Sequence, residues 1–166
     1  MPPSEQINTG ERVEDFHVFI VDDDEAFVTL IHAMLRALGI TKVTRAFSGA
    51  EAFDKLSRDE RVVDCILCDI SMENGTGLQL LRQVRTSSVP RVRPDIPFVL
   101  VTASSHPDTI GHAAQLDVSG YLVKPVTKEK LLSALKTARR RGIKVDIPRY
   151  ARVVLPEDRE GQESKK

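Results

Sequence analysis

The sequence predicts an α/β fold in which helices cover both faces of a parallel sheet. Short apolar runs alternate along the chain with segments whose apolar residues recur every three or four positions. The links between these segments are short. Parallel strands need a crossover connection, and a crossover helix packs on one face of the sheet. The alternation therefore indicates one parallel sheet between two layers of helices.

Five apolar runs flanked by turn or polar residues predict the strands. They are HVFIV from His17, KVTRAF from Lys42, DCILCD from Asp64, PFVLVT from Pro97 and SGYLVKP from Ser119. The third run holds Cys65 and Cys68, whose C-x-x-C spacing occurs in some redox and metal sites. Residues three apart on a strand point to opposite faces, so we interpret both cysteines as buried apolar residues.

Five segments have helical spacing. The clearest stripe steps by three and four and then meets Gly39, which suits a C-terminal cap. Its members are Phe27, Leu30, Ile31, Met34, Leu35 and Leu38. Ser48 and Glu51 have capping-box spacing and predict the start of a second helix. The remaining helices are marked by Leu78, Leu81 and Val84, by a weaker set from Ile110 to Leu116, and by Leu131, Leu132, Leu135 and Ala138 after Thr127.

The length suits one domain with additional segments at both ends. A chain of 166 residues, 41% of them hydrophobic, is enough for one core. We expect a flexible arm over residues 1–14, a folded domain over 15–141 and a partly disordered extension over 142–166. The extension is too short for a DNA-binding domain. Its first part, GIKVDIPRYARVVL, suits packing on the domain or on a partner, whereas the part from Pro156 is too charged to stay folded by itself.

Charge and hydropathy exclude several classes of protein. Lys and Arg together number 24, as do Asp and Glu, so the formal net charge is zero. Such a chain has no overall field that attracts nucleic acid or an anionic membrane. No apolar run approaches the ~20 residues of a membrane span, and the N-terminal segment lacks the apolar stretch of a secretory signal. We therefore expect a cytoplasmic protein.

Two basic stretches remain as local features. The run 139–141 ends the predicted fifth helix, and we interpret it as complementing the carboxyl end of that helix. The second stretch surrounds a proline-containing loop, and partner docking there is a hypothesis. It comprises Arg82, Arg85, Arg91 and Arg93.

Chemically active side chains stand at the ends of four predicted strands. In open parallel sheets, ligands collect at the carboxyl ends of the strands. An isolated acidic triplet is more often a helix cap, so the argument depends on the combination. The strand ends supply Asp22, Asp23 and Asp24, then Asp69, then Thr102, and finally Lys124.

This combination favours magnesium and a phosphoryl group. Two carboxylates ~4 Å apart repel by about 4 kcal/mol at an effective dielectric of ~20, so a cation is needed. Magnesium prefers one or two carboxylates and takes phosphate oxygens as further ligands. The Lys124 ammonium suits a phosphate oxygen. A carboxylate is able to attack phosphorus, and Asp69 is the candidate nucleophile, with Asp22 and Asp23 better placed as metal ligands.

Four motifs resemble a known family. VDDDE from Val21, CDISMENGTGL from Cys68, VTAS from Val101 and GYLVKP from Gly120 are similar to the receiver domain of bacterial response regulators, the CheY-like superfamily. The resemblance covers roughly residues 15–141. It implies a flavodoxin-like, doubly wound sheet of five parallel strands in the order 2-1-3-4-5, with helices on both faces.

The resemblance also implies roles for individual residues. Asp69 is the expected phosphoacceptor. Asp22 and Asp23 form the acidic pair, with Asp23 as the direct Mg²⁺ ligand, and the Ser71 backbone carbonyl is a further ligand.

The remaining roles fall on the last two strands. Lys124 is expected to contact the phosphoryl group and to precede a cis peptide bond to Pro125. Thr102 and Tyr121 form the expected switch pair, in which the hydroxyl moves toward the phosphate and the aromatic ring turns inward.

The sequence departs from the family pattern at a few positions. Glu73 stands where proline usually follows the loop methionine, and Thr76 stands where an acidic or amide residue often precedes the loop glycine. Ser71 and Ser104 occupy positions that influence hydrolysis of the phosphoryl group in the family.

The implied function is that of a stand-alone receiver in two-component signal transduction. It takes a phosphoryl group from a histidine kinase or a histidine phosphotransfer protein, catalyses only its own phosphorylation and dephosphorylation, and signals to a downstream protein target. No direct DNA or membrane binding is expected, and the formation of a homodimer is possible.

An alternative is a degenerate receiver that acts as a phosphorylation-independent interaction module, and Glu73 keeps this alternative open. A haloacid-dehalogenase-type phosphohydrolase is disfavoured because Ser71 replaces its second aspartate.

Overall fold

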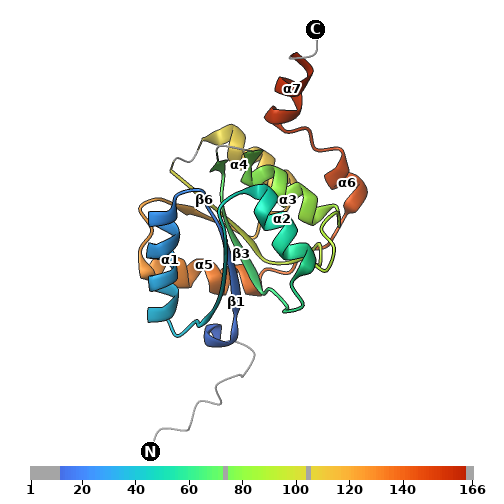
Figure 1. Cartoon of the computed structure of the whole chain (residues 1–166). Coiled ribbons are helices and arrows are strands. Elements are labelled where there is room, and N and C mark those ends of the chain that lie inside the picture. Colours follow the sequence, from blue (N-terminus) through green and yellow to red (C-terminus); the bar gives the residue numbers. More distant parts are fainter. Residues whose placement is uncertain (1–11, 73–74, 104–105, 164–166) are drawn as a thin grey trace, which may run out of the picture.

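The computed structural model describes residues 12–72, 75–103 and 106–163 and contains a parallel sheet of five strands (Figure 1). These strands are β1 (His17–Val21), β2 (Lys42–Ala46), β3 (Cys65–Asp69), β6 (Phe98–Thr102) and β7 (Gly120–Val123). Their order in the sheet is β2-β1-β3-β6-β7, and all neighbours are parallel. The predicted order 2-1-3-4-5 is therefore confirmed, with β6 and β7 as the fourth and fifth strands.

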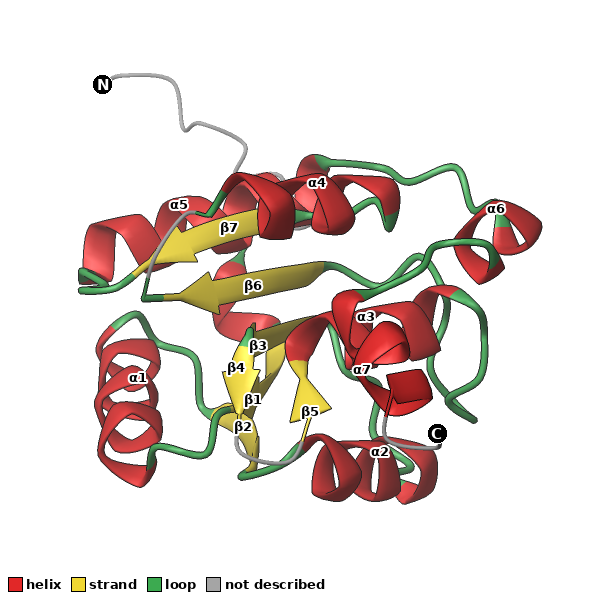
Figure 2. Ribbon diagram, turned by 90° about the horizontal axis from the view of Figure 1, so that it is seen from above, coloured by secondary structure: helices red, strands yellow, loops and turns green. Residues whose placement is uncertain are grey.

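Helices cover both faces of this sheet, as Figures 1 and 2 show. On one face lie α1 (Glu25–Ala37) and α5 (Lys128–Arg140), and on the other lie α2 (Gly49–Arg58), α3 (Gly77–Arg85) and α4 (Pro107–Gln115). The continuous apolar run of β1 follows from this arrangement: Val18 and Ile20 pack toward α1 and α5, and Phe19 and Val21 pack toward the other layer.

The two cysteines of β3 lie on opposite faces, as the strand geometry predicts. Cys65 packs in the cluster under α1 and α5, and Cys68 packs in the cluster under α2, α3 and α4. Both thiols are free and fully buried, and burial raises the pKa of Cys65 to about 12. The C-x-x-C spacing therefore forms neither a disulfide nor a shared metal site.

Most helix ends follow the expected local chemistry. Asp24 accepts a hydrogen bond from the Phe27 amide at the start of α1, and Gly39 follows that helix with a φ of 85°. Ser48 accepts from the Glu51 amide, 3.1 Å away. The Glu51 carboxylate, however, accepts from the residue before the cap and not from Ser48 itself, so only half of the predicted capping box forms.

Several elements were not expected from the sequence. A short antiparallel hairpin, β4 (Ser71–Met72) with β5 (Gly75–Thr76), lies between β3 and α3. A 3-10 turn, Val13–Asp15, precedes β1, and Val13 is buried in the cluster under α1 and α5. The packed part of the chain thus begins before residue 15, whereas residues 1–11 of the expected arm lie outside the described residues.

The C-terminal extension adds two helices, α6 (Ile147–Ala151) and α7 (Pro156–Glu163). Tyr150 and Leu155 are fully buried in the cluster under α2, α3 and α4. The segment from Pro156, which we expected not to stay folded by itself, is linked to α3 by an ion pair between Arg82 and Asp158. Of the two alternatives for the first part of the extension, the structure therefore has packing on the domain. Among the described residues, no helix combines the length and the apolar character needed to cross a membrane.

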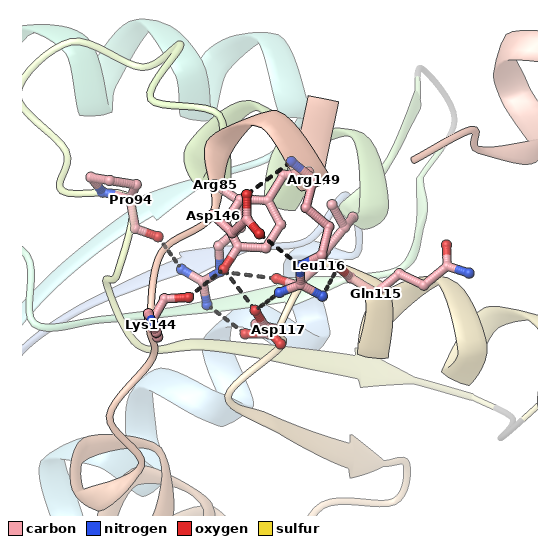
Figure 3. A network of polar contacts seen from close by, with 9 residues as sticks. Arg85, Pro94, Gln115, Leu116, Asp117, Lys144, Asp146 and Arg149 are labelled. Carbon is pink, nitrogen blue, oxygen red and sulfur yellow. Dashed lines mark hydrogen bonds and ion pairs between the residues drawn. The ribbon is translucent and has the colours of Figure 1, made fainter. Parts of the chain in front are cut away.

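Arg85, at the end of α3, joins distant segments from within the core. Its side chain is fully buried, and the guanidinium donates hydrogen bonds of 2.7 to 3.0 Å to the backbone carbonyls of Pro94, Leu116 and Asp117 (Figure 3). A further bond of 2.8 Å goes to the Ile96 carbonyl. It also donates to the Ser119 hydroxyl at 3.4 Å. The hypothesis of partner docking is therefore wrong for Arg85.

We predict that Arg85→Met lowers the free energy of unfolding by about 3 kcal/mol or more, because it leaves several buried carbonyls without a donor. The exposed Arg93 provides the matched control, since its side chain is 77% exposed. Urea denaturation of both variants measures the difference. Equal unfolding midpoints for Arg85→Met and Arg93→Met would contradict this assignment.

Candidate functional site

The strand ends bring the predicted acidic side chains and one lysine together. Asp22 follows β1, Asp69 ends β3 and Lys124 follows β7. One carboxylate oxygen from each of Asp22, Asp23 and Asp69 lies within 4.8 Å of the others. The Lys124 ammonium lies 3.1 Å from Asp22 Oδ2 and 3.7 Å from Asp69 Oδ1. Four of the predicted site residues thus form one cluster at the carboxyl edge of the sheet.

Burial makes it energetically costly to keep the carboxylates of this cluster ionised. Asp22 and Asp69 are buried, whereas Asp23 is exposed. Loss of water raises the pKa of Asp69 to about 6, and the neighbouring Asp22 carboxylate contributes to the same shift. Burial also raises the pKa of Asp22, although its Oδ1 accepts from the Asp24 amide and its Oδ2 accepts from Lys124. The three carboxylates carry more negative charge than one ammonium neutralises.

Lys124 is held from several sides. Its ammonium stands 4.0 Å from the centre of the Phe27 ring, and its backbone amide donates to the Thr102 carbonyl at 2.8 Å. The peptide bond from Lys124 to Pro125 is cis, as the family resemblance implied. The side chain is 24% exposed, so the ammonium is able to meet a ligand that enters from solvent.

The donor set fits magnesium. Hard carboxylate oxygens surround the cluster, and no histidine or cysteine belongs to the group of candidate ligands found among the described residues. An added divalent cation would offset the repulsion between the Asp22 and Asp69 carboxylates. Ser71, whose carbonyl is the further expected ligand, lies two residues after Asp69 as the first residue of β4 and is exposed.

The hairpin after β3 fixes the backbone of Asp69. The Gly77 amide donates to the Ile70 carbonyl at 2.9 Å. A Cβ atom on Gly77 would stand 2.3 Å from the Asp69 carbonyl oxygen, so only glycine permits this approach. A capping box between Thr76 and Gln79 starts α3 at the same place. The T-x-x-Q spacing was the signal in the sequence that would have located this helix start.

The expected switch residues lie on adjacent strands. Thr102 is buried at the end of β6, and its Cα is paired with that of Val123. Tyr121 is half-buried on β7 and packs against the cluster under α2, α3 and α4. Its hydroxyl is buried and has no hydrogen-bond partner in the described ranges. Glu73 and Ser104, named above as departures or modulators, lie outside the described residues.

We predict that Gly77→Ala lowers the free energy of unfolding by about 1–3 kcal/mol, because the new methyl group collides with the Asp69 carbonyl. Gly49→Ala is the control, since a Cβ there meets nothing within 4 Å. Urea denaturation distinguishes the two. The steric argument fails if both variants unfold at the same urea concentration as the parent chain.

The raised pKa of Asp69 predicts a pH dependence of stability. An acid whose pKa is higher in the folded state favours folding when protonated, so this contribution is present below pH ~4 and lost as pH rises through about 6. Asp69→Asn, neutral throughout, should be about 2 kcal/mol more stable than the parent chain at pH 7.5 and similar to it at pH 4, in EDTA.

Urea denaturation at the two pH values provides this comparison. Asp54→Asn, on the exposed face of α2, serves as the control and should show no such gain at pH 7.5. A stability difference between Asp69→Asn and the parent chain that stays constant from pH 4 to 7.5 would count against the shift.

Comparison with known proteins places this geometry in a family. The profile of the response regulator receiver domain matches residues 18–136. The transcriptional regulatory protein ZraR of Klebsiella oxytoca is 35% identical over 130 residues, which are 78% of this chain and 27% of that protein. The chain thus spans about a quarter of the length of ZraR.

Shorter relatives match over most of their length. The chemotaxis protein CheY of Pseudomonas aeruginosa is 37% identical over 114 residues, covering 69% of this chain and 88% of that protein. The structure of Vibrio cholerae CheY4 aligns with a TM-score of 0.64 at 27% identity and covers 73% of this chain and 96% of that one. From the profile, these relatives and the shared fold, it follows that the chain belongs to the response regulator receiver domain family.

Proposed function

We propose that this receiver accepts a phosphoryl group on Asp69 from the phosphohistidine of a histidine kinase or a histidine phosphotransfer protein. The observation that carries the proposal is the placement of Asp69 at a strand end, next to the Asp22 and Asp23 carboxylates and within 3.7 Å of the Lys124 ammonium. Response regulator receiver domains are signalling modules, and the relatives above are regulators and a chemotaxis protein.

The transfer needs little beyond positioning and charge. A carboxylate oxygen of Asp69 attacks phosphorus as the bond from phosphorus to the donor imidazole nitrogen breaks. The electron pair of that bond stays on the nitrogen, and an acyl phosphate forms on Asp69. With a pKa of about 6, Asp69 is largely ionised at neutral pH and ready to attack.

Charge neutralisation falls to the surrounding groups. The Asp22, Asp23 and Asp69 carboxylates, with the Ser71 carbonyl, would hold Mg²⁺, which supplies positive charge against the phosphoryl oxygens. Lys124 now contacts Asp22 and Asp69, and its ammonium is within reach of an oxygen on a phosphorylated Asp69. The chain catalyses only the formation and hydrolysis of its own acyl phosphate, because Ser71 offers no second aspartate for turnover of external esters.

The output is a changed protein surface. We propose that the Thr102 hydroxyl turns toward the phosphoryl group and that the Tyr121 ring packs into the space it leaves. Both residues lie on the β6–α4–β7 part of the chain, so a downstream protein would read the surface formed there and by α5. We propose no direct DNA binding and assign no oligomeric state.

Incubation with Mg²⁺ and acetyl phosphate tests the proposal. Intact-mass spectrometry should find one added phosphoryl group on the parent chain, none on Asp69→Asn, and none when EDTA removes the metal. Asp54→Asn, whose carboxylate lies on α2 and pairs with Arg58, should be phosphorylated like the parent chain. Equal labelling of Asp69→Asn would defeat the assignment of the phosphoacceptor. A parent chain that stays unmodified would favour a phosphorylation-independent interaction module.

A further inference from the structure

Residues 142–158, here named the C-terminal strap, run from the end of α5 across the end of α4 to α3 (Figure 1). The strap contributes Tyr150, Val153 and Leu155 to the apolar cluster under α2, α3 and α4. These three side chains are buried, so the strap is an integral layer of this face. The profile of the receiver family, by contrast, ends at residue 136, before the strap begins.

Polar contacts fix the strap at two separate places. At the first, Arg149 forms an ion pair with the Asp117 carboxylate (Figure 3). The Tyr150 hydroxyl donates to Oδ2 of the same carboxylate at 2.7 Å. At the second, Arg82 of α3 donates two hydrogen bonds to the Asp158 carboxylate, at 2.6 and 2.8 Å, and a third to the Val153 carbonyl. One anchor therefore holds α4, and the other holds α3.

Asp117 lies in the chain between the two expected switch residues, Thr102 and Tyr121. It is the second residue after α4, its φ is 48°, and β7 begins three residues later. Thr102 precedes α4 at the end of β6, and Tyr121 follows it on β7. Any rearrangement that moves Thr102 toward Asp69 and turns Tyr121 inward acts on the helix whose end the strap holds.

The strap reinforces a second connection between α3 and α4. Beneath it, Arg85 donates to the Leu116 and Asp117 carbonyls and to the Ser119 hydroxyl, which in turn accepts from the Phe98 amide at the start of β6. Arg85 is buried within the core, whereas the ion pairs of the strap are partly exposed. The ion pairs of the strap are thus the more accessible part of this junction, and Arg85 is the buried part.

We propose that the C-terminal strap is a conformational brake whose attachment to α4 and α3 is coupled to the phosphoryl state of Asp69. Hydrogen bonds tolerate only small changes in distance and angle, so a shift of α4 relative to α3 weakens the Asp117 anchor while the Arg82 anchor stays in place. Phosphorylation then loosens the strap. Because coupling between two sites is reciprocal, loosening the strap favours the phosphorylated conformation. This inference rests on the proposed function.

Hydrogen exchange of the full chain tests the first direction. With Mg²⁺ and beryllofluoride, a mimic of the phosphoryl group, exchange at the amides of Tyr150, Val153 and Leu155 should accelerate about fivefold or more. These amides are hydrogen-bonded within the strap, so their exchange reports its release. Asp69→Asn should show no acceleration under the same conditions.

Calorimetric titration with beryllofluoride in Mg²⁺ tests the reciprocal direction. Asp158→Asn breaks the anchor on α3, and Tyr150→Phe removes one hydrogen bond of the anchor on α4 while it keeps the buried ring. Both should bind beryllofluoride about threefold or more tightly than the parent chain. Asp54→Asn is the matched control, because it breaks an exposed ion pair on α2 and should leave the affinity unchanged. Asp158 is one-third exposed, so its variant keeps the test valid even where Tyr150→Phe folds poorly.

The outcomes separate the two proposals. In one outcome, the parent chain binds beryllofluoride, the strap amides exchange no faster in its presence, and Asp158→Asn and Asp54→Asn bind it with equal affinity. The coupling is then overturned, and the proposed function stands. If the parent chain binds no beryllofluoride at all, the proposed function is overturned, and the coupling with it.

Discussion

The repulsion between two buried carboxylates, those of Asp22 and Asp69, is the constraint on which the site depends. The parallel sheet places these groups together because β1 and β3 are neighbours and end level with each other. Lys124 offsets part of the charge, and burial still raises the pKa of both acids. The resulting set of hard oxygen ligands is one that suits a divalent cation such as Mg²⁺.

Much of the fold and of the site could be predicted from the sequence because the informative signals are local. The strands β1, β3, β6 and β7 are short runs of mainly apolar residues, and the residue at the carboxyl end of each run is read directly, as with Asp69 and Lys124. Parallel topology then converts positions far apart in the chain into one edge of a sheet. The same logic correctly separated Cys65 from Cys68.

The remaining features depend on partners that no local pattern identifies. Arg85 resembles any basic residue at a helix end, yet four carbonyls from two later segments surround it. The strap contains apolar residues, but its sequence does not identify the surface that receives them, and Tyr150 is buried against α3 and the end of α4. The close approach of Gly77 to Asp69 likewise arises from a hairpin whose strands are two residues long. Such contacts become visible only in three dimensions.

The burial of Cys68 has a chemical consequence for its neighbour in the sequence. A thiolate is a stronger nucleophile than a carboxylate, and one standing beside Asp69 would react with electrophiles and peroxides that reach the cluster. Strand alternation turns the sulfur into the apolar layer, where burial and the adjacent carboxylates raise its pKa well above the usual value. The chain therefore has a cysteine next to Asp69 whose thiol stays protonated at neutral pH and has no contact with solvent.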